Sequence, residues 1–182
     1  MGKVFKEFHT SDSRRVVLRT PRMSDLDDFL EFINSLVDEG AEILVEQKLT
    51  REAEADWLGK HLADIEKGVV IGVAGEVDGK IVANSEVRRG IGKRSHVGTL
   101  GIAIRDGYRD LGIGTKIMQV LIEESKKAGL QLLRLTVFDS NLRAKHVYKK
   151  VGFREVGKIP RAIRHQDRYV DEVVMVLPLQ QT

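Results

Sequence analysis

The sequence predicts an α+β domain, in which a mixed central sheet of about seven strands is flanked by about four helices. Three observations favour this class. Segments with strand periodicity and segments with helix periodicity alternate along the chain. An Asp78-Gly79 turn joins two adjacent strand segments. A strand–helix–strand unit follows that hairpin and requires at least one parallel pair in an otherwise antiparallel sheet.

The first part of the chain is predicted to form one strand and two helices. Alternation over residues 15–20 indicates the strand, which Pro21 ends. Ser24 and Asp27 resemble a capping box that opens an amphipathic helix through about residue 37. Thr50 is a candidate N-cap for a second helix, for which we expect a buried stripe of Ala53, Trp57, Leu58 and Leu62.

The remaining segments complete the sheet. Asp78-Gly79 tolerates the positive φ of a tight turn, so residues 69–76 and 81–89 are expected to form a hairpin. There follow a strand at 96–104, a helix at 111–128 ended by Gly129, a strand at 132–138, a helix at 141–151 and a closing hairpin of 153–164 with 168–177. We expect one domain over residues 15–179, preceded by an N-terminal extension of residues 1–14.

Composition excludes several classes of protein. The 182 residues are 42% hydrophobic and 31% charged, as in an ordinary globular domain, and neither a membrane-length apolar run nor a signal-peptide core is present. The absence of cysteine excludes disulfides and an acyl-enzyme thioester, and it is compatible with the cytoplasm, where we expect the protein. Five histidines without ligand spacing argue against a metal site.

The net charge of +3 and the sequence pI near 9.1 raise the question of nucleic-acid binding. Charges of both signs are interspersed, and aromatic residues make up only 5% of the chain, too few for base-stacking platforms. We therefore interpret the charge as a solvated surface and expect no nucleic-acid partner.

The most informative segment is the strand end Ile102-Ala103-Ile104 with the glycine turn that follows it. This turn, Arg109 to Lys116, alternates Gly112 and Gly114 with Leu111 and Ile113 at the start of a helix. Backbone N–H groups at such a helix start can bind an anion, and glycine lets a phosphate approach. It is not a P-loop, because Ile113 and Gly114 stand where Lys and Ser/Thr are required, and Ile117 replaces the third glycine of a Rossmann turn. A glycine-capped strand–helix turn is the structural alternative.

A second block strengthens the functional interpretation. The turn matches the pattern R/Q-x-x-G-x-G/A, and downstream the chain matches N-x-x-A-x-x-x-Y-x-x-x-G-F with Asn141, Ala144, Tyr148, Gly152 and Phe153. In order, spacing and separation, the two blocks resemble the GNAT superfamily of acetyltransferases, over about a third of the chain. The resemblance implies a GNAT fold, acetyl-coenzyme A as co-substrate and direct transfer of the acetyl group to a primary amine.

The resemblance also implies a set of cofactor-binding residues. Ile102, Ala103 and Ile104 would pair with the pantetheine arm through their backbone, and Asn141 would either contact that arm or cap its helix. The pyrophosphate would be held by the backbone N–H groups of the glycine turn, namely Arg109, Asp110, Leu111, Gly112, Ile113, Gly114 and Thr115, with the Thr115 hydroxyl as an additional candidate donor.

Catalytic roles follow from the same resemblance. Tyr148 stands at the position of the general acid that protonates the leaving thiolate, and the alternative is a packing tyrosine. The general base is less defined: Glu86 on the 81–89 strand is the first candidate and His96 the second, while a surface charge explains Glu86 as well.

The amine acceptor is expected near the loop between the first two helices and near the final hairpin. The loop carries Asp38, Glu39, Glu42 and Glu46, which suit a cationic amine. The hairpin carries Arg161, Arg164, His165, Arg168 and Tyr169, which suit a carboxylate or a peptide, and its last strand resembles that of members acting on amino acids or protein N-termini. These two acceptors are favoured over a polyamine. A non-catalytic coenzyme A-binding regulatory module is the alternative of another class, and the closing hairpin is a candidate homodimer edge.

Overall fold

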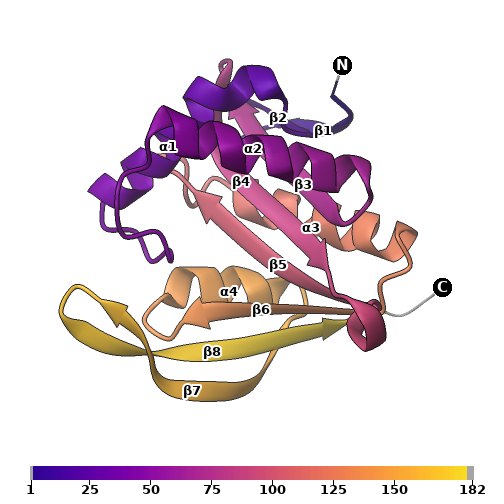
Figure 1. The fold of residues 1–182 in the computed structure, drawn as a ribbon, viewed down its shortest axis with the longest axis vertical. Coiled ribbons are helices and arrows are strands. Elements are labelled where there is room, and N and C mark those ends of the chain that lie inside the picture. The colour runs from indigo at the N-terminus through magenta and orange to yellow at the C-terminus, as the bar shows by residue number, and fades with distance from the viewer. Residues whose placement is uncertain (1, 180–182) are drawn as a thin grey trace.

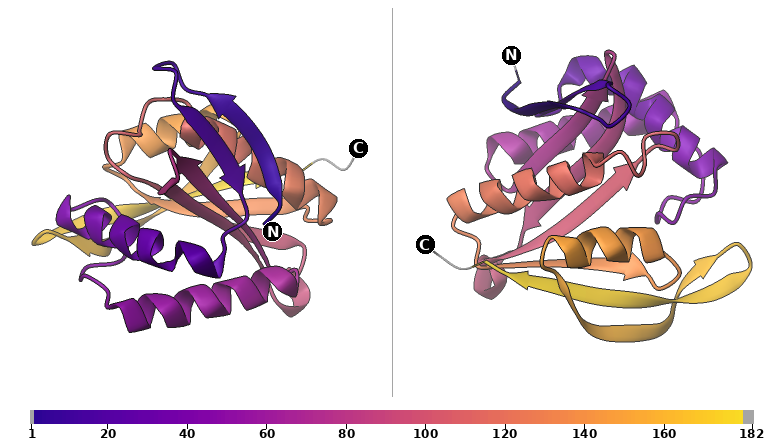
Figure 2. Two further views of the ribbon diagram at one scale, coloured as in Figure 1. Left: turned by 90° about the horizontal axis from the view of Figure 1, so that it is seen from above. Right: turned by 180° about the vertical axis from the view of Figure 1, so that it is seen from behind.

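The computed structural model describes residues 2–179, which form one eight-stranded mixed sheet with helices on both faces (Figures 1 and 2). The elements in chain order are β1 (Val4–His9), β2 (Arg15–Arg19), the 3₁₀ turn η1 (Met23–Asp25), α1 (Leu26–Asp38), α2 (Arg51–Glu66), β3 (Val70–Val77), β4 (Lys80–Arg89), η2 (Gly92–Arg94), β5 (Val97–Ile104), α3 (Ile113–Lys127), β6 (Leu132–Phe138), α4 (Leu142–Lys150), β7 (Arg154–His165) and β8 (Arg168–Pro178).

The sheet order is β1-β2-β3-β4-β5-β6-β8-β7, and every neighbouring pair is antiparallel except β5 and β6. That parallel pair is short, since only Val97–Thr99 of β5 register with residues 132–134 of β6. Beyond Thr99 the two strands separate like the arms of a V (Figure 1). The separation interrupts the sheet in its middle and leaves one edge of β5 unpaired.

The helices bury two apolar clusters, one on each face of the sheet. On one face α1 and α2 cover β3 and β4 with Phe29, Phe32 and Leu58. On the other face α3 and α4 cover the sheet, and α3 contributes Ile117 and Met118, which are fully buried. Figure 2 shows the two helix layers on opposite sides of the sheet. This double cover makes the central strands a rigid support for the open end of the V.

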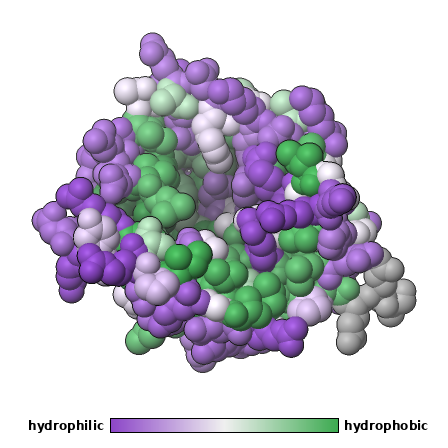
Figure 3. All heavy atoms as spheres, turned by 60° about the horizontal axis from the view of Figure 1, so that its bottom comes forward, coloured by the Kyte–Doolittle hydropathy of each residue, from purple (hydrophilic) through white to green (hydrophobic). Residues whose placement is uncertain are grey.

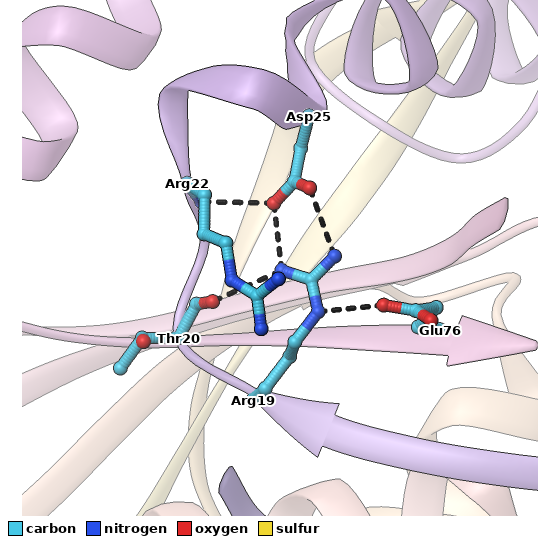
Figure 4. Close-up of polar contacts among 5 residues, drawn as sticks. All are labelled: Arg19, Thr20, Arg22, Asp25 and Glu76. Atoms are coloured by element: carbon cyan, nitrogen blue, oxygen red, sulfur yellow. Dashed lines mark hydrogen bonds and ion pairs between the residues drawn. The ribbon is translucent and has the colours of Figure 1, made fainter. Parts of the chain in front are cut away.

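A buried ion cluster joins β2 and β3 to η1 (Figure 4). The Arg19 guanidinium donates to both carboxylate oxygens of Asp25, at 2.7 and 2.8 Å, and to Glu76 Oε2 at 2.6 Å. Asp25 also accepts from the Arg22 backbone N–H at 2.8 Å. The predicted Ser24–Asp27 capping box was therefore wrong: the carboxylate that caps this turn is Asp25, and Asp27 pairs with Arg51 at the surface.

Other differences from the sequence prediction have simple physical causes. The sheet has eight strands instead of about seven, because the segment expected as an extension contains β1, which pairs with β2. Its burial alternates weakly, since it lies at the sheet edge. Helix α3 begins two residues later than predicted because Gly112, at φ +81°, is left-handed and cannot be helical. The buried residues of α2 are Glu54, Leu58 and His61, whereas Ala53 and Trp57 are exposed.

Candidate active site

A cleft of about 640 Å³ lies where β5 and β6 separate. Its walls come from β5, the glycine turn, α4 and the loop between α1 and α2. The space-filling view shows a hollow in the face turned forward there, with hydrophobic side chains on its walls and hydrophilic ones around them (Figure 3). Segments far apart in the sequence thus meet around one opening, as expected for a ligand site.

The glycine turn presents free backbone donors to this cleft. Gly112 is the N-cap of α3 and provides no side-chain cap, whereas Thr50 and Asn141 cap α2 and α4 by accepting a backbone N–H. The first backbone N–H of α3 that reaches a helical carbonyl is that of Lys116, at 3.1 Å from the Gly112 oxygen. The preceding N–H groups lack intrahelical acceptors and carry the positive end of the helix dipole, so this end of the cleft suits an anion.

The structure brings most of the predicted phosphate-binding residues to the cleft. Five of the seven line it: Arg109, Asp110, Gly112, Gly114 and Thr115. The other two, Leu111 and Ile113, direct their side chains into the core and can contribute only through the backbone.

The Arg109 guanidinium is occupied by protein groups. Its Nε donates to the Ile104 carbonyl at 2.8 Å, and Nη2 contacts the Glu39 carboxylate. Arg109 therefore links the glycine turn to the end of α1 instead of extending toward a phosphate.

Strand β5 offers the cleft an unpaired backbone edge. The cleft is lined by Ile102, Ala103 and Ile104. On one side these residues pair with β4, and on the other side they have no strand partner, because the pairing with β6 ends at Thr99. Ala103 packs toward the α1/α2 cluster, whereas Ile102 and Ile104 pack toward the α3/α4 cluster. A linear ligand with amide groups can pair with such an edge as an additional strand would.

Asn141 takes the capping role that the sequence left open. Its side-chain oxygen accepts the Ala144 N–H at 2.9 Å. The residue also lines the cleft, and among residues 2–179 its amide nitrogen donates no hydrogen bond. The cap and a contact from the amide nitrogen to a ligand are therefore compatible, because the two use different atoms.

Tyr148, on α4, reaches the cleft from a buried position. Its side chain is 7% exposed and its ring packs 6.2 Å from that of Phe153. Burial raises the pKa of the Tyr148 phenol to about 12, because desolvation penalises the phenolate. No group among residues 2–179 hydrogen-bonds its hydroxyl, so the protonated phenol is available to a ligand in the cleft.

The two candidate bases lie in very different places. Glu86 on β4 does not line the cleft, but it registers with Gly101 of β5, next to the lining residue Ile102. The contact with His61 lowers the pKa of Glu86, although burial opposes this shift. His96 precedes β5 at the end opposite the cleft and is exposed, so it was a wrong candidate.

A second groove, of about 630 Å³, adjoins the cleft. It lies between the α1–α2 loop and the tip of the β7–β8 hairpin, and both openings share Leu36, Ala41 and Ile43. The predicted acceptor segments therefore do come together.

The acidic loop residues are mostly engaged. Asp38 pairs with Lys48 at 2.8 Å, Glu39 with Arg109, and Glu42 accepts from the Ser140 hydroxyl. On the hairpin, Arg161 stacks on Tyr169 at 4.7 Å, and Arg164 lines the groove with His165.

Sequence reasoning missed the apolar residues that join cleft and groove, and it missed His61. Of these, Ala41 and Ile43 lie in a loop without periodicity, so no pattern marked them, and Leu36 belongs to the buried face of α1, where packing alone explains it. His61 follows Leu58 by three residues and Glu54 by seven, a helical spacing that would have placed it on the buried face had polar residues been admitted there.

Two further observations concern the described part of the chain. No helix within residues 2–179 has the length and apolar character needed to cross a membrane. Within the same range, no three His, Asp or Glu side chains are grouped so that they could hold a metal ion.

Comparisons with known proteins agree with this geometry. A model of the acetyltransferase (GNAT) family matches residues 29–153. An N-alpha-acetyltransferase of Sulfurisphaera tokodaii is 29% identical over 160 residues, covering 81% of this chain and 83% of the relative. The L-amino acid N-acetyltransferase AaaT of Escherichia coli is 30% identical over 110 residues, covering 60% and 66%.

Solved structures share the fold. The structure of yncA from Salmonella typhimurium, determined with its cofactor acetyl-CoA, superposes with a TM-score of 0.80 at 17% identity, covering 92% of this chain and 95% of that one. The ribosomal-protein-S5-alanine acetyltransferase of Vibrio fischeri gives 0.85 at 15% identity, covering 98% and 97%. With a glycine turn, an unpaired β5 edge and a buried Tyr148 around one cleft, and with a family model that spans most of its length, this chain belongs to the GNAT family of acetyltransferases.

Proposed function

We propose that this protein transfers the acetyl group of acetyl-coenzyme A to a primary amine by direct attack in a ternary complex. The observation that carries the proposal is one cleft that joins the uncapped N-terminus of α3 to the protonated Tyr148 phenol. The first suits the pyrophosphate of coenzyme A, and the second suits the departing sulfur. The residues present therefore fit acetyl-coenzyme A, and the glycine turn and the β5 edge would hold it.

The chain's own groups would then divide the reaction as follows. Backbone groups near Ile102–Ile104 orient the thioester and stabilise the oxyanion. The amine nitrogen forms a bond to the carbonyl carbon, and the carbon–sulfur bond breaks. Tyr148 gives its proton to the thiolate, Glu86 receives the amine proton through water, and solvent restores the phenol. No acyl-enzyme forms, and the sequence contains no cysteine that could carry one.

The proton acceptor favours the α-amine of a peptide over a polyamine. Because the pKa of Glu86 lies below its ordinary value, the site has a weak base. The α-amine of a peptide, with a pKa of about 7.7–8.0, is largely neutral near pH 8, whereas an alkylamine such as the lysine side chain, at about 10.4, remains charged. A weak base is sufficient for the first acceptor and much less effective for the second.

The groove supports the same preference. Three acidic groups of the α1–α2 loop are already engaged, which leaves few free charges for a polycation. Its other wall carries Arg164 and His165, which suit a carboxylate or a peptide backbone. Two of the relatives are named for activity on N-terminal and amino-acid amines. We therefore favour a protein N-terminus or a free amino acid as the acceptor.

The test is thiol release from acetyl-coenzyme A across three acceptor panels: short peptides with free N-termini, single amino acids and polyamines. We expect release with one of the first two panels and an acetyl group on the α-amine by mass spectrometry. Tight binding of acetyl-coenzyme A without release by any panel would indicate a non-catalytic coenzyme A-binding module instead.

A further inference from the structure

A buried histidine between α2 and the central sheet has no role in the site described so far. His61 lies on the inner face of α2 and is 2% exposed. Its ring stacks on Trp57 at a centroid distance of 4.9 Å and an interplanar angle of 14°. Among residues 2–179, neither ring nitrogen has a partner in hydrogen-bond geometry. A buried polar side chain so placed calls for an explanation.

The nearest charged group to the imidazole is the carboxylate of Glu86. His61 Nδ1 lies 3.1 Å from Glu86 Oε2, at ion-pair distance. The contact joins α2 to the central strand β4 and depends on a glycine, which has no side chain, on the neighbouring strand β3. A Cβ on Gly72 of β3 would lie 2.9 Å from His61 Nε2 and 2.6 Å from Ile65 Cδ1. Glycine at 72 therefore makes the room in which His61 reaches Glu86.

On its other side Glu86 faces open space. Its register partner on β5 is Gly101, and directly opposed residues project to the same face of a sheet. A Cβ on Gly101 would have no neighbour within 4 Å. The next residue of β5 on that face is Ala103, which lines the cleft and is roughly 7 Å farther along the strand. Glu86 is thus flanked by His61 on one side and, on the other, by the open space over Gly101, two residues along β5 from the cleft-lining Ala103.

The charged neighbours of Glu86 come from two elements. From β4, Arg88 Nε lies 3.6 Å from Glu86 Oε1, while its Nη1 is bound by Asp64 of α2 at 2.6 Å. From α2, His61 supplies the closer contact. The flanking strands present only Gly72 and Gly101 at this level. Because the Arg88 guanidinium forms its closer ion pair with Asp64, His61 is the main group that holds the Glu86 carboxylate.

We propose that His61 is a positioning residue for acetyl transfer, holding the Glu86 carboxylate ionised and oriented toward the opening over Gly101 where the acceptor amine loses its proton. This proposal rests on the proposed acetyltransferase function and adds a group to it. His61 touches neither substrate and transfers no proton itself. The proton moves from the amine nitrogen through water to a Glu86 oxygen.

The test compares the pH dependence of kcat in four proteins: wild type, His61→Leu, His61→Gln and the control Ile65→Val. The His61 contact lowers the pKa of Glu86, so its loss raises that pKa. In His61→Leu the acidic limb of the profile is therefore expected to move to higher pH. Because the carboxylate also loses the contact that orients it, kcat above that limb should fall about tenfold, with KM for acetyl-coenzyme A unchanged. His61→Gln, which keeps a polar N–H group beside Glu86, should recover part of the loss. Ile65→Val removes a methyl group over Gly72, leaves His61 in place and should match wild type.

A second readout does not require catalysis. Carbon-13 labelling of glutamate side chains lets the Glu86 carboxyl be titrated by NMR, with Glu86→Gln identifying its signal. The signal should titrate at higher pH in His61→Leu than in wild type or Ile65→Val. An unchanged titration, or an unchanged acidic limb in a folded His61→Leu protein, overturns the proposal.

The outcomes separate this proposal from the function on which it rests. Full kcat in Glu86→Gln would remove Glu86 from the reaction and overturn the role of His61, while acetyl transfer itself stands. Absence of transfer by the wild-type protein to every acceptor panel would instead overturn the proposed function.

Discussion

Replacing Tyr148 by phenylalanine tests the chemical role of the cleft most selectively. The substitution removes one oxygen from a side chain that is 7% exposed and leaves the ring packed beside Phe153. Because no group among residues 2–179 hydrogen-bonds that hydroxyl, the free energy of unfolding should change little. General acid catalysis contributes about 10²–10⁴ in rate. We therefore expect kcat to fall by about that factor, equivalent to roughly 3–5 kcal/mol in the activation free energy.

The assay is acetyl-coenzyme A-dependent thiol release at saturating acceptor, with the dissociation constant of acetyl-coenzyme A measured by calorimetry on the same samples. The dissociation constant should stay within about twofold of wild type, because the glycine turn proposed to bind the phosphates is untouched. Since the pKa of Tyr148 is raised to about 12, its phenol stays protonated and should produce no alkaline loss of activity below about pH 11. A mutant with wild-type kcat would remove Tyr148 from the acid role.

Three further predictions concern binding and stability. Gly112→Ala and Gly79→Ala each place an L-residue at a positive φ, +81° and +76°, with no neighbour within 4 Å of the new Cβ, so both variants should lose about 1–2 kcal/mol of stability by denaturant titration. Only Gly112→Ala should weaken the binding of acetyl-coenzyme A, and equal affinities of the two variants would contradict the assignment of the glycine turn to the phosphates. Asp25→Ala leaves Glu76 as the remaining carboxylate partner of the buried Arg19 and should cost about 3 kcal/mol, the lower end of the range for breaking a buried ion pair. Asp27→Ala breaks an exposed pair and should cost about 0–1 kcal/mol; a loss for Asp25→Ala as small as this would show that the buried cluster is not stabilising. Asn141→Ala removes the α4 cap and should cost about 1 kcal/mol while raising KM for acetyl-coenzyme A; an unchanged KM would limit Asn141 to capping.

The parts of the fold that the sequence predicted well are those with a clear local signal. Strand 132–138 was placed to the residue, and the Asp78-Gly79 hairpin was correct to within one residue at each strand end, because buried alternation and turn chemistry mark them. Thr50 caps α2 as expected. The edge strand β1 was missed because edge strands bury little and show weak alternation.

The site divides in the same way. The glycine turn and Tyr148 could be predicted because their backbone geometry and spacing are encoded in short motifs. The position of Glu86 relative to the cleft could not, because it depends on which residues of β3 and β5 oppose it, and register is a tertiary property. His96 was wrong for the same reason: the direction of β5 places it at the end opposite the cleft.

The partners of the acidic residues near the α1–α2 loop could not be predicted from the sequence either. Asp38, Glu39 and Glu42 looked like free carboxylates, yet their partners Lys48, Arg109 and Ser140 are brought to them by the fold. A run of charges in a loop therefore predicts a local field poorly until its partners are known.

The proposed function requires that one cleft both bind acetyl-coenzyme A and transfer its acetyl group to an α-amine. The most direct measurement incubates the protein with acetyl-coenzyme A and a short peptide with a free N-terminus, with a free amino acid as the parallel acceptor, and follows thiol release together with the product mass. We expect stoichiometric thiol release and a single acetyl group on the α-amine of one of the two acceptors. Bound acetyl-coenzyme A with no acetylated product from either would contradict it.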